Sequence, residues 1–93
     1  MELKKARENL DNIDQEIVLL LAKRLSLVKE LAQYKAENNI SMKDLDREKE
    51  ILLKTSELGE KHNLRKEYVQ DIFKRIIEES HNIQKKDYRQ IIL

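Results

Sequence analysis

Charged residues interrupt the apolar face of an otherwise helical sequence, and they are the first candidates for chemistry. Arg24 stands between Leu20 and Leu27, in a stretch where apolar residues recur every three or four positions. Lys35 follows Arg24 by eleven residues, which is about three helical turns, so both cations share one side of a helix. Burying an unpaired cation costs on the order of several kcal/mol. The spacing therefore indicates a bound anion or paired carboxylates.

Two further groups of polar residues lie on helical faces later in the chain. Asp44, Arg47 and Glu48 follow the spacing i, i+3, i+4 and share one face of a helix. Ser80 and Gln84 continue the line of apolar residues that precedes them. Each predicted helix thus carries polar groups on or beside its apolar face. Together they predict a cationic pocket in a small helical protein.

Each feature also has a purely structural interpretation. An Arg in an apolar seam often sets helix register or extends its charged end to solvent. Acidic residues such as Asp44 and Glu48 are favoured in the first turn of a helix, and a hydroxyl or amide can be tolerated at the edge of a core. Arg7 alone indicates a surface position. His62 and His81 have no metal-ligand companion at helical spacing, so we expect both to face solvent.

The longest predicted helix comes first. Apolar residues at steps of three and four predict a helix over residues 1–37, about 50 Å long at 1.5 Å per residue. Asn38 and Asn39 favour its end, because Asn is common in caps and turns.

Two shorter helices follow. The second is predicted to begin between Ser41 and Asp44, which are both suitable N-cap residues. It should run to about Leu58, with Gly59 as its C-terminal stop. The third should begin between residues 64 and 67 and continue at least to Gln84. The fold class is therefore all-α, with three helices in one domain over residues 1–93.

The unequal helix lengths predict an intertwined homodimer. Helices of about 16 and 25 residues cannot cover both sides of a helix about 50 Å long within one compact chain. The apolar seam of the first helix is therefore expected to meet the same seam of a second copy.

The composition excludes several other classes. One Gly and no Pro among 93 residues cannot supply the turns of a sheet protein. No Cys is present, which removes thiolate chemistry and Cys-based zinc sites and fits a reducing compartment. A net charge of +1 with mixed signs argues against nucleic acid as a partner. The longest apolar run is too short for a membrane span, so we expect a cytoplasmic protein.

At these positions the sequence strongly resembles the all-helical class of chorismate mutase, over nearly the whole chain. That family's fold is an intertwined homodimer of three-helix chains. The resemblance implies the conversion of chorismate to prephenate by an intramolecular Claisen rearrangement, on the path to Phe and Tyr, with no cofactor and no metal. The residues that carry it, in order, are Arg7, Arg24, Lys35, Asp44, Arg47, Glu48, Ser80 and Gln84.

The resemblance also implies roles for the cationic side of the site. Arg24, with an Arg7 contributed by the partner subunit, would bind the two substrate carboxylates, for which the planar guanidinium is suited. Lys35 and Gln84 would donate hydrogen bonds to the ether oxygen, where negative charge develops. Because Gln84 is a neutral donor, activity is expected to be nearly flat with pH until Lys35 deprotonates.

The remaining roles concern the ring hydroxyl and the shape of the site. By resemblance, Glu48 and the region of Asp44 would hold the hydroxyl. Arg47 would orient this acidic pair and contact substrate, and Ser80 would assist a carboxylate. With Arg7 included, these side chains sum to +2, which suits a dianion.

Two other functions fit the same residues. An isochorismate-pyruvate lyase of this fold would have a similar cationic pocket. A non-catalytic helical module could instead bind an anionic regulator or dimerise a larger shikimate-pathway enzyme. The presence of Lys35 and Gln84 favours turnover, because a pure binder has no need to polarise an ether oxygen.

Overall fold

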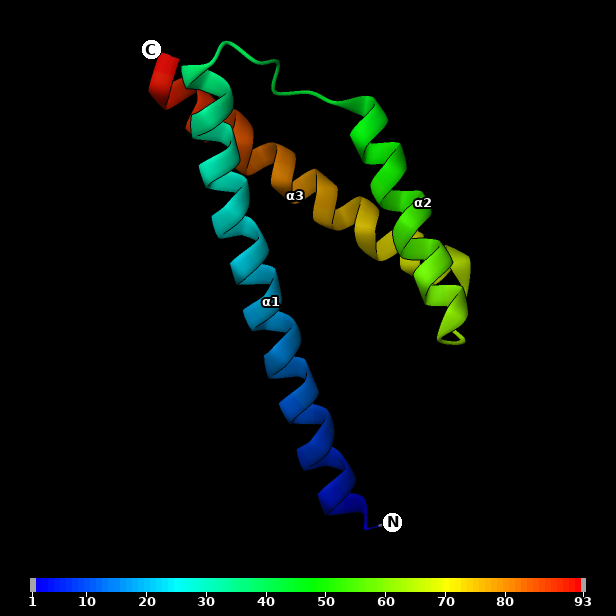
Figure 1. The fold of residues 1–93 in the computed structure, drawn as a ribbon. Coiled ribbons are helices and arrows are strands. Elements are labelled where there is room, and N and C mark those ends of the chain that lie inside the picture. The colour runs from blue at the N-terminus through cyan, green and yellow to red at the C-terminus, as the bar shows by residue number, and fades with distance from the viewer. Residues whose placement is uncertain (1, 93) are drawn as a thin grey trace.

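The protein is described by a computed structural model that covers the backbone of residues 2–92 and the side chains of residues 2–86. Three helices make up its regular structure: α1 (Leu3–Glu37), α2 (Leu45–Lys61) and α3 (Lys66–Ile92). Figure 1 shows α1 as the long helix, with α2 and α3 beside its C-terminal half. The prediction of an all-α chain with one long N-terminal helix is confirmed.

The first helix is continuous over 35 residues, because its sequence contains neither Pro nor Gly. It ends at the two asparagines, as predicted. Asn38 donates from its side chain to the carbonyl of Tyr34 at 2.9 Å. Asn39 adopts a left-handed conformation with φ of 55°, and the amide of Ile40 then returns to the carbonyl of Lys35 at 2.8 Å. These bonds satisfy carbonyls that the helix end would leave free.

The second helix begins where predicted, at Asp44. Its carboxylate Oδ1 accepts a hydrogen bond from the backbone amide of Arg47 at 3.0 Å, which is the usual N-cap contact. The helix does not stop at Gly59, so that prediction was wrong. It continues to Lys61, and Asn63, with φ of 63°, makes the left-handed turn instead.

Gly59 serves helix packing rather than helix termination. The residue is buried, and a Cβ at this position would lie only 2.6 Å from Cγ2 of Val69 on α3. The missing side chain therefore lets α2 approach α3 closely near the turn that connects them. This need for space could not be read from the sequence, because Gly is also the usual residue just beyond a helix end.

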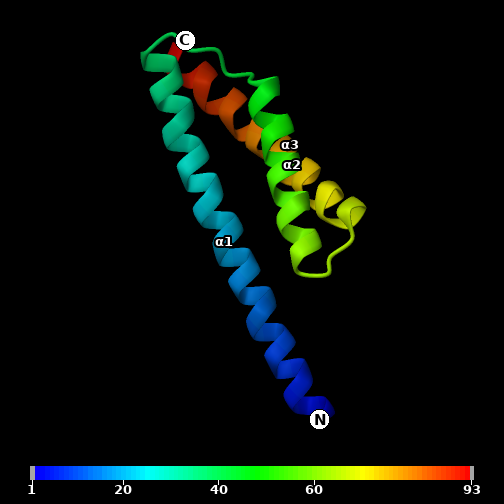
Figure 2. The same cartoon turned by 45° about the vertical axis from the view of Figure 1, so that its right-hand side comes forward.

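The third helix packs against both of the others. Figures 1 and 2 show α3 crossing the C-terminal half of α1 and lying alongside α2. The apolar residues buried at these contacts are few and mostly small, which lets the helix axes approach: Val28, Ala32, Ala36, Val69 and Ile77. Helix α3 is thus the element that holds α1 and α2 around one shared space.

The N-terminal half of α1 extends away from α2 and α3 in both views (Figures 1 and 2). The chain is accordingly elongated, with extents of 56 × 25 × 14 Å. The apolar seam of α1, which continues into its C-terminal half, stays uncovered, with 44–64% of each residue exposed: Leu10, Ile13, Ile17, Leu20, Leu27 and Leu31. Within the described residues, none of the helices has the length and apolar character needed to cross a membrane.

Candidate functional site

A cavity of about 240 Å³ lies between the C-terminal half of α1, the start of α2 and the C-terminal half of α3. Its apolar lining comes from all three helices and the loop after α1. Seven of the eight predicted site residues line it, and one unpredicted polar residue, His81, joins them. The predicted residues that meet there are Arg24, Lys35, Asp44, Arg47, Glu48, Ser80 and Gln84.

Arg24 is fixed by a contact between helices. Its guanidinium Nη1 donates to the hydroxyl of Ser80 at 2.6 Å, and the Ser80 hydroxyl donates in turn to the carbonyl of Ile76 at 2.9 Å. Because the Ser80 hydroxyl donates its hydrogen to that carbonyl, its oxygen accepts the hydrogen bond from Arg24 through a lone pair. The contact directs the guanidinium across the gap between α1 and α3 and leaves most of its five N–H donors for a ligand.

Lys35 joins α1 to the loop and to α3. Its ammonium donates to the backbone carbonyl of Met42 at 3.1 Å and to Oε1 of Gln84 at 3.4 Å. An ammonium has three N–H donors, so one remains for a ligand. Because Gln84 uses its oxygen toward Lys35, its amide NH₂ is the group that can donate elsewhere. Lys35 and Gln84 can therefore present two hydrogen-bond donors to one ligand atom.

Glu48 is contacted by His81 of α3, which was not expected from the sequence. Its Oε1 lies 3.0 Å from Nε2 of His81, while its Oε2 is buried and has no hydrogen-bond partner among residues 2–86. The expectation that His81 faces solvent was wrong: its side chain is 34% exposed and lies against α2. His62 is exposed, as expected.

The signal for His81 was present in the helical spacing. It lies four residues after the buried Ile77 and three before the buried Gln84, so it shares their side of α3. The contact between His81 and Glu48 was not predicted, because the partner of His81 is a single carboxylate on another helix and not a metal ligand on its own helix.

Arg47 and Asp44 sit at the exposed rim. Asp44 uses one carboxylate oxygen to cap α2. The guanidinium of Arg47 donates to Glu50 at 3.0 Å, and Lys54 donates to the same Glu50 oxygen at 2.7 Å. Arg47 therefore does not pair with Asp44 or Glu48 in this structure, because an acidic residue one turn further along the exposed side of α2 competes for it.

Arg7 is the one predicted site residue that lies outside the cavity. It is exposed on the projecting half of α1. Seventeen residues separate it from Arg24 on the same helix, which is about 25 Å at 1.5 Å per residue. Arg7 therefore cannot reach the cavity of its own chain.

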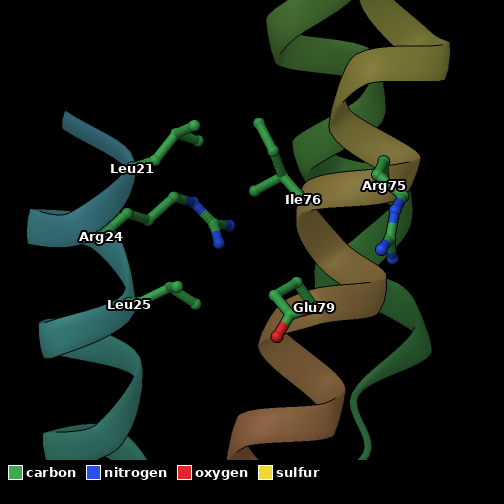
Figure 3. Close-up of a pocket in the computed structure, with 6 residues that line it drawn as sticks. All are labelled: Leu21, Arg24, Leu25, Arg75, Ile76 and Glu79. Carbon is green, nitrogen blue, oxygen red and sulfur yellow. The ribbon is translucent and has the colours of Figure 1, made fainter. Parts of the chain in front are cut away.

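A second hollow of about 230 Å³ lies on the other side of Arg24 (Figure 3). In Figure 3 the Arg24 side chain extends from α1 toward α3, with Leu21 and Leu25 on either side of it and Ile76 opposite. The residues that line this hollow are Leu21, Arg24, Leu25, Arg75, Ile76 and Glu79. Arg24 thus separates a mainly apolar hollow from the polar cavity.

The polar cavity is net cationic. Arg24, Lys35 and Arg47 oppose Asp44 and Glu48, which leaves one positive charge before any contribution from His81. Burial lowers the pKa of Arg24, and the nearby Arg47 charge lowers it further, but a guanidinium stays protonated under these conditions. A site of this kind can bind an organic anion and place donors beside it. None of the described residues that line it is an obvious nucleophile.

Fold and site together define a small three-helix protein with a net-cationic cavity for an organic anion. Residues 6–85 match the family described as chorismate mutase type II. The chain therefore belongs to that family, as the resemblance predicted.

Individual relatives agree with this membership. The chain is 50% identical over 80 residues to a bifunctional chorismate mutase/prephenate dehydratase of Buchnera aphidicola subsp. Acyrthosiphon pisum, covering 86% of this chain and 21% of that protein. It is 34% identical over 74 residues to the protein of the same description from Escherichia coli K12, covering 80% and 19%. A chorismate mutase of Methanocaldococcus jannaschii is 34% identical over 84 residues, covering 90% and 85%. The chain thus spans about a fifth of the bifunctional relatives and most of the last protein.

Proposed function

We propose that this chain is a chorismate mutase, which converts chorismate to prephenate in the biosynthesis of Phe and Tyr. The observation that carries the proposal is the convergence of Arg24, Lys35 and Gln84, from two helices, on one cavity. Family membership supports the same reaction. No nucleophile is required, because the rearrangement is intramolecular: one C–O bond breaks, one C–C bond forms, and no atom leaves.

Binding would hold the substrate in its reactive shape. Arg24 can bind one carboxylate bidentately, since its contact with Ser80 leaves further N–H donors free. A second carboxylate needs a second cation, for which we propose Arg7 of a partner subunit. Two fixed carboxylates would keep the enolpyruvyl group folded over the ring, so that the two reacting carbons stay near one another.

Charge stabilisation would come from Lys35 and Gln84. As the ether bond breaks, negative charge grows on its oxygen. The third N–H of Lys35 and the amide NH₂ of Gln84 can both donate to that oxygen, because their contact at 3.4 Å already orders them next to one another. Donors that are placed before the reaction need little rearrangement in the transition state, which is where they lower the barrier.

The ring hydroxyl would bind at the α2 side of the cavity. Glu48 offers the buried Oε2 as an acceptor, and the region of Asp44 lies beside it at the rim. Arg47 can reach the substrate if it leaves Glu50, so its contact with substrate belongs to this proposal. The role of Ser80 is to orient Arg24 toward a carboxylate, which its 2.6 Å contact supports.

We propose a homodimer in which the projecting halves of α1 pair antiparallel. If Arg7 of one copy lies opposite Arg24 of the other, the two-fold axis falls between residues 15 and 16, halfway between them. That point lies within the uncovered apolar seam, between Ile13 and Ile17. Pairing of the seam would bury apolar surface and complete the site at the same time.

The cellular setting is also a proposal. The bifunctional relatives are described as joining a chorismate mutase to a prephenate dehydratase, so this chain either acts alone or forms one domain of such an enzyme. We place it in the cytoplasm, which the lack of Cys fits. The reaction needs no cofactor and no metal, and neither nucleic acid nor a membrane is a proposed partner.

The test is proton NMR of chorismate incubated with the purified chain. Prephenate should appear faster than in buffer, and this gain should be lost in Arg24→Ala but kept in Lys23→Ala, an exposed cation one residue away. Circular dichroism of both variants checks that the helices are intact. If chorismate persists at the background rate, isochorismate is tested next, and pyruvate release would identify the lyase. If a folded dimer forms neither product, the remaining function is that of a non-catalytic helical module.

A further inference from the structure

Glu48 is the less exposed of the two carboxylates that line the cavity. Its Oε1 contacts Nε2 of His81 at 3.0 Å, across the interface between α2 and α3. Its other oxygen, Oε2, is buried without a hydrogen-bond partner in the part of the chain whose side chains are described. A buried acceptor that is left unpaired costs free energy, so the arrangement is stable only if something compensates for it.

The contact with His81 involves only one of the two Glu48 oxygens. A polar contact at 3.0 Å to Oε1 restricts the rotation of the carboxylate and keeps Oε2 directed away from His81. Both residues line the polar cavity. Among the described residues no donor reaches Oε2, and a hydroxyl of a bound ligand is a group that can do so.

We propose that His81 is a positioning residue that holds Glu48 to receive the substrate hydroxyl. This inference rests on the proposed function. His81 acts through Glu48 and need not touch the substrate. An N–H at Nε2 can donate to Oε1 of Glu48, and this leaves Oε2 for the hydroxyl of a ligand.

The expected kinetic signature is a change in KM rather than in kcat. A hydroxyl bound equally in the ground state and the transition state contributes to KM and leaves kcat unchanged.

Two substitutions separate the donor of His81 from its size. His81→Gln keeps an N–H donor, so its KM should stay near that of the wild type. His81→Leu removes the donor, and KM should rise about tenfold with little change in kcat, as expected for one lost hydrogen bond. His62→Gln, at an exposed histidine at the far end of α2, is the matched control and should behave as the wild type. Equal KM in all four proteins would overturn the proposal.

A second measurement does not depend on turnover. Unfolding by urea is followed for the wild type, His81→Leu, Glu48→Gln and the double variant. Coupling between the two substitutions supports the contact between His81 and Glu48. Additive effects would overturn it, even if chorismate is converted. Coupling without any mutase activity would instead reject the proposed function and keep His81 as the residue that holds Glu48.

Discussion

The guanidinium of Arg24 on α1 donates to the hydroxyl of Ser80 on α3 at 2.6 Å, although the two residues are 56 positions apart in the chain. The hydroxyl in turn donates to the carbonyl of Ile76 one turn earlier. A buried serine on one helix thus orients the cation of another. This relationship makes the position of Arg24 depend on how α1 and α3 pack.

Ser80→Ala should therefore lower activity without unfolding the chain. Alanine fits the space of the buried serine, but Arg24 loses its acceptor and its fixed direction. The expected loss in kcat/KM is about tenfold to a hundredfold, the effect of one hydrogen bond to a charged group. Steady-state kinetics measure it, with Ser26→Ala on the exposed side of α1 as the control. Unchanged kcat/KM would show that Arg24 needs no such support.

Lys35→Met should act mainly on kcat. It keeps a similar length and removes the donor to the ether oxygen, so kcat should fall about a hundredfold to a thousandfold. Lys29→Met, an exposed residue on the same helix, should be silent. If Lys35→Met raised KM alone, Lys35 would be a residue for binding only, and the donor role would have to pass to Gln84.

Mixing two inactive variants tests the shared site. In a dimer of one Arg7→Ala chain and one Arg24→Ala chain, one site carries both lesions and the other carries neither. Purified heterodimers should recover up to about half of the wild-type activity, by this count of sites. Homodimers of each variant are the controls. If the heterodimers are as inactive as either homodimer, Arg7 does not act in the partner's site.

Gly59→Ala should destabilise the fold. The added Cβ would meet Val69 at 2.6 Å, and such overpacking costs about 1–3 kcal/mol. That cost should exceed the gain of up to about 1 kcal/mol that Ala brings to a helix interior. Thermal unfolding at fixed protein concentration measures it. Adding Val69→Ala makes room for the new methyl group, so the double variant should lose less than the two single losses combined.

Glu50 should contribute a small stability that depends on pH. The hydrogen bond from Lys54 and its charge lower the pKa of Glu50, with a further contribution from Arg47. A carboxyl whose pKa is lower in the folded state stabilises the fold above its unfolded-state pKa and loses this effect as pH falls through the folded value. Wild type should thus exceed Glu50→Gln in stability at neutral pH only. Urea unfolding on both sides of about pH 4, the ordinary carboxyl range, checks this. A stability difference between the two proteins that persists in acid would show that Glu50 stabilises the fold by packing and not by its charge.

Local signals in the sequence accounted for the helices and for most of the site. The Asn38–Asn39 end of α1 and the Asp44 cap of α2 were predictable, because caps and helix ends depend on residues that are near in the chain. Arg24 and Lys35 were recognisable as members of one face for the same reason. Gly59 was misread, because its reason for being small is Val69 on another helix.

The helical class, the shared faces of the polar residues and the family could all be predicted, since they follow from residue types at fixed spacing along one chain. Which of those polar groups touch depends on the tertiary structure. It joined Arg24 to Ser80, turned Arg47 toward Glu50 and brought His81 to Glu48. The physical reason is that helical periodicity fixes the direction of a side chain about its own axis, whereas contacts between helices depend on their crossing and separation, which the packing of small residues sets.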